Sequence, residues 1–218
     1  TALESYSYSL GLVAAPSGMI QRNGWIVSPM GTDDDGNVIF SNGYGLWQDM
    51  VAAELNNPTY LELSVPEATI DNETRDIKLN VQIESALNMK NQYINVFPVA
   101  LEDGLINSQD NNFYIYDDPE FGEWGKNGKY GSATAYNVTH NEVVRTYWGS
   151  ITGTNIGFPQ KFEAGEKYSQ ELTLSYPESV EVHENGKIVL MIIDGNTGVT
   201  LNAVTVPFSQ LVPAGIDD

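Results

Sequence analysis

The feature that most constrains the fold is a strict alternation of apolar and polar residues in the stretch R-D-I-K-L-N-V-Q-I-E, residues 75–84. Aliphatic side chains from Ile77 to Ile83 fall at every second position, and polar side chains fill the positions between them. Because successive side chains of a β-strand point to opposite faces, this pattern predicts a strand with one buried and one solvated face. Strands of this kind are typical of antiparallel sheets.

Further segments with strand patterns follow one another through the last two thirds of the chain. Turn residues separate them, such as D-N-E-T before Arg75 and D-G-N after Ile193, and no helical period intervenes. Residues 58–218 are therefore predicted to be mainly β, an immunoglobulin-like antiparallel β-sandwich. The predicted strands are 60–65, 75–84, 93–101, 113–116, 139–149, 166–176, 187–194 and 199–208.

Two local features add detail to this prediction. Pro98 lies within the segment 93–101 and lacks a backbone N–H, so it predicts an edge strand or a β-bulge. The connection from Asp103 to Val138 is rich in Asn, Asp, Gly and aromatic residues, and it is too long for a plain hairpin.

The first 57 residues have a different pattern. We expect a short helix over 3–12, a proline turn at Pro16, a hairpin around Asp35-Gly36 and a helix over 46–55. That order is typical of the C-terminal half of a thioredoxin-like fold, in which a cis peptide bond would precede Pro16. The apolar face of the second helix is predicted to hold Leu46, Met50, Val51 and Leu55.

We therefore divide the chain into a partial thioredoxin-like α+β segment, 1–57, and a β-sandwich domain, 58–218. The alternative for the first segment is a small independent α+β cap. We interpret Thr1 as lying downstream of the natural start, and we expect a partner chain or a second copy to cover the apolar surface of the half domain.

Composition excludes several classes of function. The chain holds 29 acidic and 10 basic residues, a formal net charge of −19, which repels nucleic acids and anionic membrane surfaces and suits cations or basic partners. Without cysteine it has no disulfide and no thiolate nucleophile. Its acidic clusters lack the spacing of a calcium loop, and neither a phosphate-binding loop nor a serine nucleophile with a nearby histidine is present. We predict no metal, no cofactor and no enzymatic activity.

Three short motifs occur together in one half of the chain. The first is V-A-L-E-D-G, residues 99–104, followed by Gln109; the second is H-N-E-V-V-R, residues 140–145; the third is Trp148-Gly149. Jointly they resemble the signature of a Bacteroidetes outer-membrane lipoprotein family that is named for a mass of about 28 kDa. Pro16 and Arg22 also match the family's G-x-P-x-x-x-x-N-R pattern.

The resemblance implies a thioredoxin-like portion before a β-sandwich, a lipid anchor in the precursor, and an outer-membrane or cell-surface location. Gln21 departs from the asparagine of the family pattern, and Val144 stands where leucine is common. Glu142 stands where a second histidine is common, which weakens any two-histidine metal site.

His140 and Arg145 are conspicuous in a chain with two histidines and ten basic residues. They could form an anion site, or they could be structural groups at the rim of the sandwich that bind loop carbonyls or the carboxylates of Glu102 and Asp103. The two positions differ by an odd number, so on one regular strand they face opposite sides and share a site only across a bulge. The family-motif residues, including Trp148, are predicted to be structural.

Aromatic side chains gather in the long connection, at Tyr114, Tyr116, Trp124, Tyr130 and Tyr136. They could stack on sugar rings or anchor a partner protein, or they could form a small core under the loop. Our candidate surface-binding residues are Tyr114, Tyr116, Trp124 and Tyr130.

The sequence thus favours a non-enzymatic exported outer-membrane lipoprotein that binds or adheres through its sandwich loops, with a protein or glycan as partner. The alternatives are a carbohydrate-binding module, and a thioredoxin-like protein whose redox half is missing from this chain.

Overall fold

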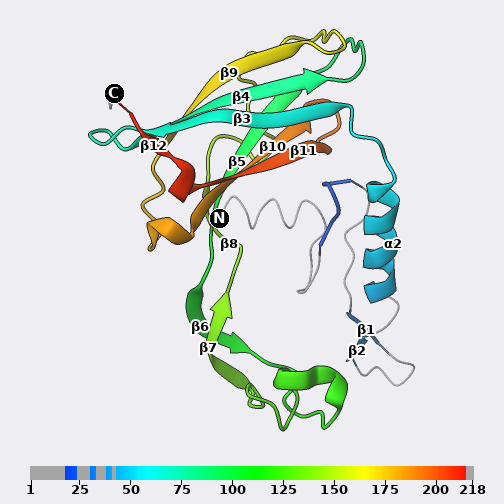
Figure 1. The fold of residues 1–218 in the computed structure, drawn as a ribbon. Coiled ribbons are helices and arrows are strands. Elements are labelled where there is room, and N and C mark those ends of the chain that lie inside the picture. Colours follow the sequence, from blue (N-terminus) through cyan, green and yellow to red (C-terminus); the bar gives the residue numbers. More distant parts are fainter. Residues whose placement is uncertain (1–17, 24–29, 33–37, 41–42, 215–218) are drawn as a thin grey trace.

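The computed structural model describes residues 18–23, 30–32, 38–40 and 43–214 (Figure 1). The helix predicted over 3–12, the peptide bond before Pro16 and the turn at Asp35-Gly36 lie outside these residues. Strand β1, Met30–Thr32, pairs antiparallel with β2, Val38–Phe40, as the hairpin pattern predicts. Helix α2, Gly43–Leu55, confirms the second predicted helix. Val51 and Leu55 of its apolar face are exposed.

Two sheets of four strands form the main body of the described chain (Figure 1). One sheet has the order β11-β10-β5-β8 and the other the order β12-β3-β4-β9; all neighbours are antiparallel except β12 and β3. The predicted mainly β sandwich is confirmed. The strands are β3 Leu61–Ile70, β4 Asp76–Ser85, β5 Ile94–Glu102, β8 Val143–Tyr147, β9 Lys167–Ser175, β10 Gly186–Asp194, β11 Thr200–Pro207 and β12 Val212–Pro213.

The core lies between the two sheets. The four aliphatic side chains of β4, from Ile77 to Ile83, are fully buried, and they share one cluster with Ile188, Leu190 and Ile192 of β10. Burying a side chain of this size contributes about 1.5–3 kcal/mol, so the alternation in β4 alone sets which face of that sheet turns inward.

Pro98 does not mark an edge, because β5 pairs with β10 on one side and with β8 on the other. Trp148 donates its backbone N–H to the Pro98 carbonyl (3.2 Å), so this carbonyl points toward β8. The Pro98 nitrogen points to the same side, where β8 ends at Tyr147. The missing N–H therefore falls at the end of the β5–β8 ladder. A bulge does occur close by, between Ala100 and Leu101.

The long connection between β5 and β8 is a two-stranded ribbon that extends away from the sandwich (Figure 1). Strand β6, Leu105–Asp110, pairs antiparallel with β7, Thr134–His140, and the 3₁₀ segment η1, Pro119–Trp124, lies between them. We call residues 105–140 the arm. Two further 3₁₀ turns, η2 at His183–Asn185 and η3 at Phe208–Gln210, lie in the sandwich.

Two strand predictions fail in this region. The segment 113–116, F-Y-I-Y, is a turn, because the side chain of Asn111 accepts the Phe113 N–H (2.9 Å) and bends the backbone as soon as β6 ends. The segment 139–149 is not one strand but the end of β7, a turn and then β8. Glu142 has φ 56°, which breaks an extended strand.

Candidate functional site: the arm and its base

A buried carboxylate lies at the base of the arm. Glu102, the last residue of β5, is 0% exposed, and its side chain accepts the backbone N–H groups of Glu181 (3.0 Å) and Val182 (2.7 Å). Arg145 completes the site, with Nε 3.3 Å from Glu102 Oε2. A charge this deeply buried requires such partners, since an unpaired one would cost several kcal/mol.

The bulge explains how Arg145 reaches Glu102. Leu101 pairs with Val144 and Ala100 pairs with Thr146, so Arg145 is the extra residue on β8. A bulge redirects one side chain relative to the ladder. The guanidinium also donates to the Ser179 carbonyl and pairs with the carboxylate of Glu181 (3.1 Å), so it ties β8 to the segment before β10.

Asp103 forms a second, more exposed ion cluster beside the first. Its carboxylate accepts from Lys187 Nζ (2.7 Å) and from the Glu142 backbone N–H (2.8 Å), and Lys187 also pairs with the Glu142 carboxylate. The hydrogen bond from Lys187, followed by that from the Glu142 N–H, holds the pKa of Asp103 below its usual value. The same pairing with Asp103 raises the pKa of Lys187.

The turn into the arm is held by the same two motifs. Gly104 has φ 74°, and its N–H donates to the side chain of Asn141 (2.9 Å). The E-D-G and H-N-x-V-x-R motifs are therefore neighbours in space, where both strands of the arm leave the sandwich. Side chains of both motifs supply the contacts that fix the turn into the arm.

His140 and Arg145 are placed on different strands. His140 ends β7 and pairs with Leu105 of β6, whereas Arg145 lies in β8. His140 Nε2 is buried and has no hydrogen-bond partner among the described residues. Because the guanidinium is already occupied by Glu102, Ser179 and Glu181, the geometry gives no support to a shared anion site.

Trp148 connects the two sheets. Its indole packs against the main core, and its Nε1–H donates to the Ser175 carbonyl at the end of β9 (3.0 Å). Tryptophan suits this position because its ring can be buried in the core while its indole N–H donates a hydrogen bond.

A buried asparagine organises the tip of the arm. Asn111 is 2% exposed, and its Nδ2 donates to the carbonyls of Trp124 (2.8 Å) and Tyr130 (2.7 Å). The Asn111 side chain also accepts the Phe113 N–H, so it connects three separate points of the loop through hydrogen bonds. We did not select this residue from the sequence, although Asn directly after a strand is a known turn former.

The aromatic side chains of the tip divide into two groups. Phe113 and Phe121 stack with centroids 5.1 Å apart, and Trp124 packs on Tyr130 at 4.8 Å with a 35° tilt, so part of the cluster is a small core. Tyr114 and Tyr116 are exposed, although the ring of Tyr116 also packs against Phe121 with centroids 5.2 Å apart. Of the four candidate binding residues, these two lie at the surface, and Trp124 and Tyr130 are half-buried.

Aliphatic and aromatic side chains are also exposed along the arm. Tyr136 on β7 is 69% exposed, Ile106 on β6 is 61% exposed, and Ile115 at the tip is 58% exposed. Isolated exposed apolar residues are ordinary, but several on one projecting element are typical of binding surfaces.

Acidic residues at the tip of the arm stabilise the conformation of its loop by accepting hydrogen bonds. Asp118 accepts the Glu120 N–H at the start of η1 (2.9 Å), and Asp117 accepts from the side chain of Asn127. Within the described residues, no group of three His, Cys, Asp or Glu side chains has the geometry to hold a metal ion. No described helix is both long and apolar enough to cross a membrane.

Comparison with known proteins identifies the family. The sequence profile described as outer membrane protein Omp28 matches residues 4–207, almost the whole chain. The chain belongs to the Omp28 family of outer membrane proteins. The resemblance that the three motifs indicate is thereby confirmed. No curated protein matches this Omp28-family chain.

One solved structure shares the fold at low identity, and a second matches part of the chain. HBP35 of Porphyromonas gingivalis superposes with a TM-score of 0.60 at 8% identity, over 100% of this chain and 60% of that protein. A domain of the outer membrane lipoprotein Omp28 from Porphyromonas gingivalis is 17% identical over 72% of this chain and 92% of that domain, with a TM-score of 0.35. At these identities the likeness to HBP35 concerns the fold alone.

Proposed function

We propose that this Omp28-family chain is a non-enzymatic surface protein of the outer membrane, lipid-anchored in its precursor, that binds a partner protein through the arm. Family membership supports the membrane location. The observation that carries the binding role is the set of exposed apolar side chains, Ile106, Ile115 and Tyr136, on an element that projects from the sandwich.

The arm is suited to binding because its base and its tip are both held in place. The ion clusters of Glu102 and Asp103 hold the two strands where they leave the sandwich, and Asn111 closes the loop at the far end. A surface that is ordered before binding loses less conformational entropy when a partner docks.

The charge of the arm indicates the chemistry of the partner. Residues 105–140 contain five acidic residues and two lysines, and the whole chain has a net charge of −19. Attraction of opposite charges raises association rates, so the preferred partner has an apolar patch surrounded by basic residues.

The test compares proteins retained from outer-membrane and host-surface extracts by immobilised wild type and by the double variant Ile115→Ser/Tyr136→Ser. Leu87→Ser, an exposed apolar residue of the sandwich, is the matched control. The purified partner should bind wild type and control equally and the double variant about 100-fold more weakly. Equal binding by all three, or turnover of a substrate by the chain, would reject the proposal.

A glycan partner is the second candidate, and the exposure of both Tyr114 and Tyr116 at the tip favours it. Exposed tyrosine rings stack on the apolar faces of sugars. Binding of a neutral glycan that is lost in Tyr114→Ala/Tyr116→Ala, and kept in Ile115→Ser/Tyr136→Ser, would select this function over a protein partner.

The two-part organisation also remains a proposal. We propose a thioredoxin-like segment up to residue 57, which the order β1-β2-α2 supports, followed by an immunoglobulin-like sandwich, which the sheet orders β11-β10-β5-β8 and β12-β3-β4-β9 support. A second copy or partner over the exposed face of α2 would fit the same organisation, and the oligomeric state in solution tests it.

A further inference from the structure

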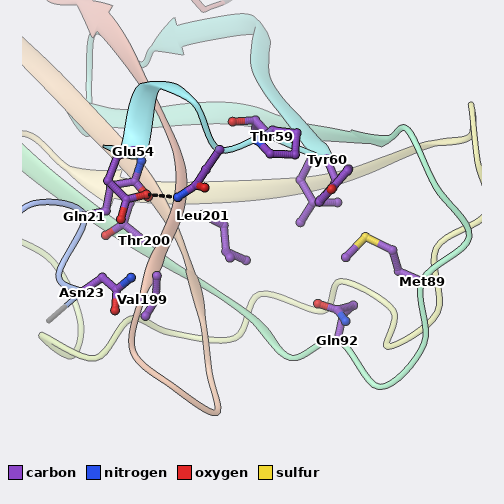
Figure 2. A pocket seen from close by; sticks show the side chains of 13 residues that line it. Gln21, Asn23, Glu54, Thr59, Tyr60, Met89, Gln92, Val199, Thr200 and Leu201 are labelled. Atoms are coloured by element: carbon purple, nitrogen blue, oxygen red, sulfur yellow. Dashed lines mark hydrogen bonds between the residues drawn. The ribbon is translucent and has the colours of Figure 1, made fainter. Parts of the chain in front are cut away.

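A pocket of about 190 Å³ lies far from the arm in sequence, where α2 and the segment around Gln21 meet the sandwich. Figure 2 shows side chains from four parts of the chain directed toward one space, among them Glu54 of α2, Tyr60, Gln92 and Thr200. This volume is smaller than that of a typical drug-sized site.

The walls of the pocket are tied to one another. The Thr200 backbone N–H, at the start of β11, donates to the Gln21 carbonyl (2.8 Å) and so joins the N-terminal segment to the sandwich. The Asn57 side chain also donates to Glu54 (2.9 Å), the hydrogen bond drawn as a dashed line at Glu54 in Figure 2. The pocket is therefore bounded by elements that the fold itself holds together.

One polar group of the pocket lacks a partner. Thr200 is 9% exposed, and its buried Oγ1 has no hydrogen-bond partner in the described structure. Less than 1 Å² of this oxygen is accessible to solvent, so a ligand in the pocket would contact the other polar side chains of the lining instead.

The chemistry of the lining selects a neutral ligand with many hydroxyl groups. Four carboxamides line the pocket, at Gln21, Asn23, Asn57 and Gln92, and each both donates and accepts hydrogen bonds. The ring of Tyr60 is available for stacking against an apolar face of a ligand.

Charged ligands fit the pocket poorly. Its described lining contains one carboxylate, Glu54, and neither lysine nor arginine, so no cationic group balances the charge of a phosphate or a sugar acid there. A calcium ion needs six to eight oxygen ligands, usually with several carboxylates. We propose that this pocket binds a neutral pyranose monosaccharide, independently of the partner that the arm binds.

The test uses saturation-transfer and ¹H–¹⁵N NMR on the whole chain with glucose, galactose and N-acetylglucosamine, and with glucuronic acid as the charged comparison. We expect millimolar binding of at least one neutral sugar, with shift changes at residues 59–61, 89–92 and 199–201. Glucuronic acid should bind at least about tenfold more weakly.

Two variants make the test specific. Tyr60→Ala removes the exposed ring that would stack on the sugar, so it should fold normally and bind the sugar about tenfold more weakly. Gln92→Ala should weaken binding similarly, and Thr173→Val on the exposed face of β9 should have no effect.

The proposal is overturned if none of the neutral sugars shifts the pocket resonances, if glucuronic acid binds as tightly, or if Tyr60→Ala binds like wild type. Failure of the arm proposal is seen separately, because Ile115→Ser/Tyr136→Ser leaves the pocket unchanged.

Discussion

Arg145 lies at a bulge of β8 with its Nε 3.3 Å from the fully buried carboxylate of Glu102 at the end of β5. The two residues are far apart in sequence because the whole arm is inserted between them. Their pairing therefore closes the base of the arm, and it gives the E-D-G and H-N-x-V-x-R motifs a physical reason to occur together.

Glu102→Ala should lower the free energy of unfolding by about 3 kcal/mol. The substitution leaves the Arg145 guanidinium without its buried partner and removes the acceptor of the Glu181 and Val182 N–H groups. Chemical denaturation measures the loss. Glu181→Ala removes an equal charge from an exposed partner of Arg145 and should cost no more than about 1 kcal/mol, so equal losses would contradict the assignment.

Asn111→Ala should unfold the tip of the arm while the sandwich stays folded. Two carbonyls and one N–H lose their partner, at a cost of about 1–3 kcal/mol for the groups left unsatisfied. Hydrogen exchange should accelerate over residues 111–132 and remain slow in β4 and β10. The neighbouring Asn112 is exposed, and Asn112→Ala serves as the control; similar exchange in both variants would refute the role of Asn111.

Gln21→Asn should stabilise the chain by about 0.5–1 kcal/mol. Gln21 and Arg22 both have positive φ, 49° and 57°, and the Asn23 N–H donates to the Ile20 carbonyl (2.9 Å), the geometry of a type I′ turn. Asparagine tolerates this conformation better than glutamine. Gln48→Asn in the helix α2, as a control, should be neutral or destabilising in the same denaturation experiment.

Stability should fall in acid partly through Asp103. Lys187 and the Glu142 N–H hold its pKa below the usual value in the folded protein, so the pairing stabilises the fold at neutral pH. That contribution declines as the pH falls below about 3.9, the ordinary pKa of aspartate, and disappears below the lower pKa of the folded state.

Denaturation curves collected across this acidic range test the pH dependence. Asp103→Asn should flatten the slope of stability against pH below about 3.9, and Lys187→Met should do the same because it removes the first cause of the lowered pKa. An unchanged slope in both variants would show that Asp103 is not a source of the acid sensitivity.

The sandwich could be predicted because each of its strands has a recognisable local sequence pattern. The alternation from Ile77 to Ile83 allows one face to be buried, and the D-G-N turn after Ile193 places β11 next to β10. Of the two exceptions, one depends on a strand that is distant in sequence, and the other on the nearby side chain of Asn111, a turn signal that the sequence does contain. Pro98 is tolerated in a central strand because β8 ends opposite it, and the F-Y-I-Y segment is bent by the side chain of Asn111.

The amino-acid sequence by itself determined that this chain is mainly β, that it carries a strongly acidic surface, and that its motifs are those of an outer-membrane family. These properties follow from local periodicity, composition and short motifs. Only the tertiary structure decided that Glu102 is buried and paired with Arg145, that the long connection is an arm, and that Thr200 faces Gln21 across the chain. Each of these depends on the pairing register of strands that are distant in sequence, which no local pattern encodes.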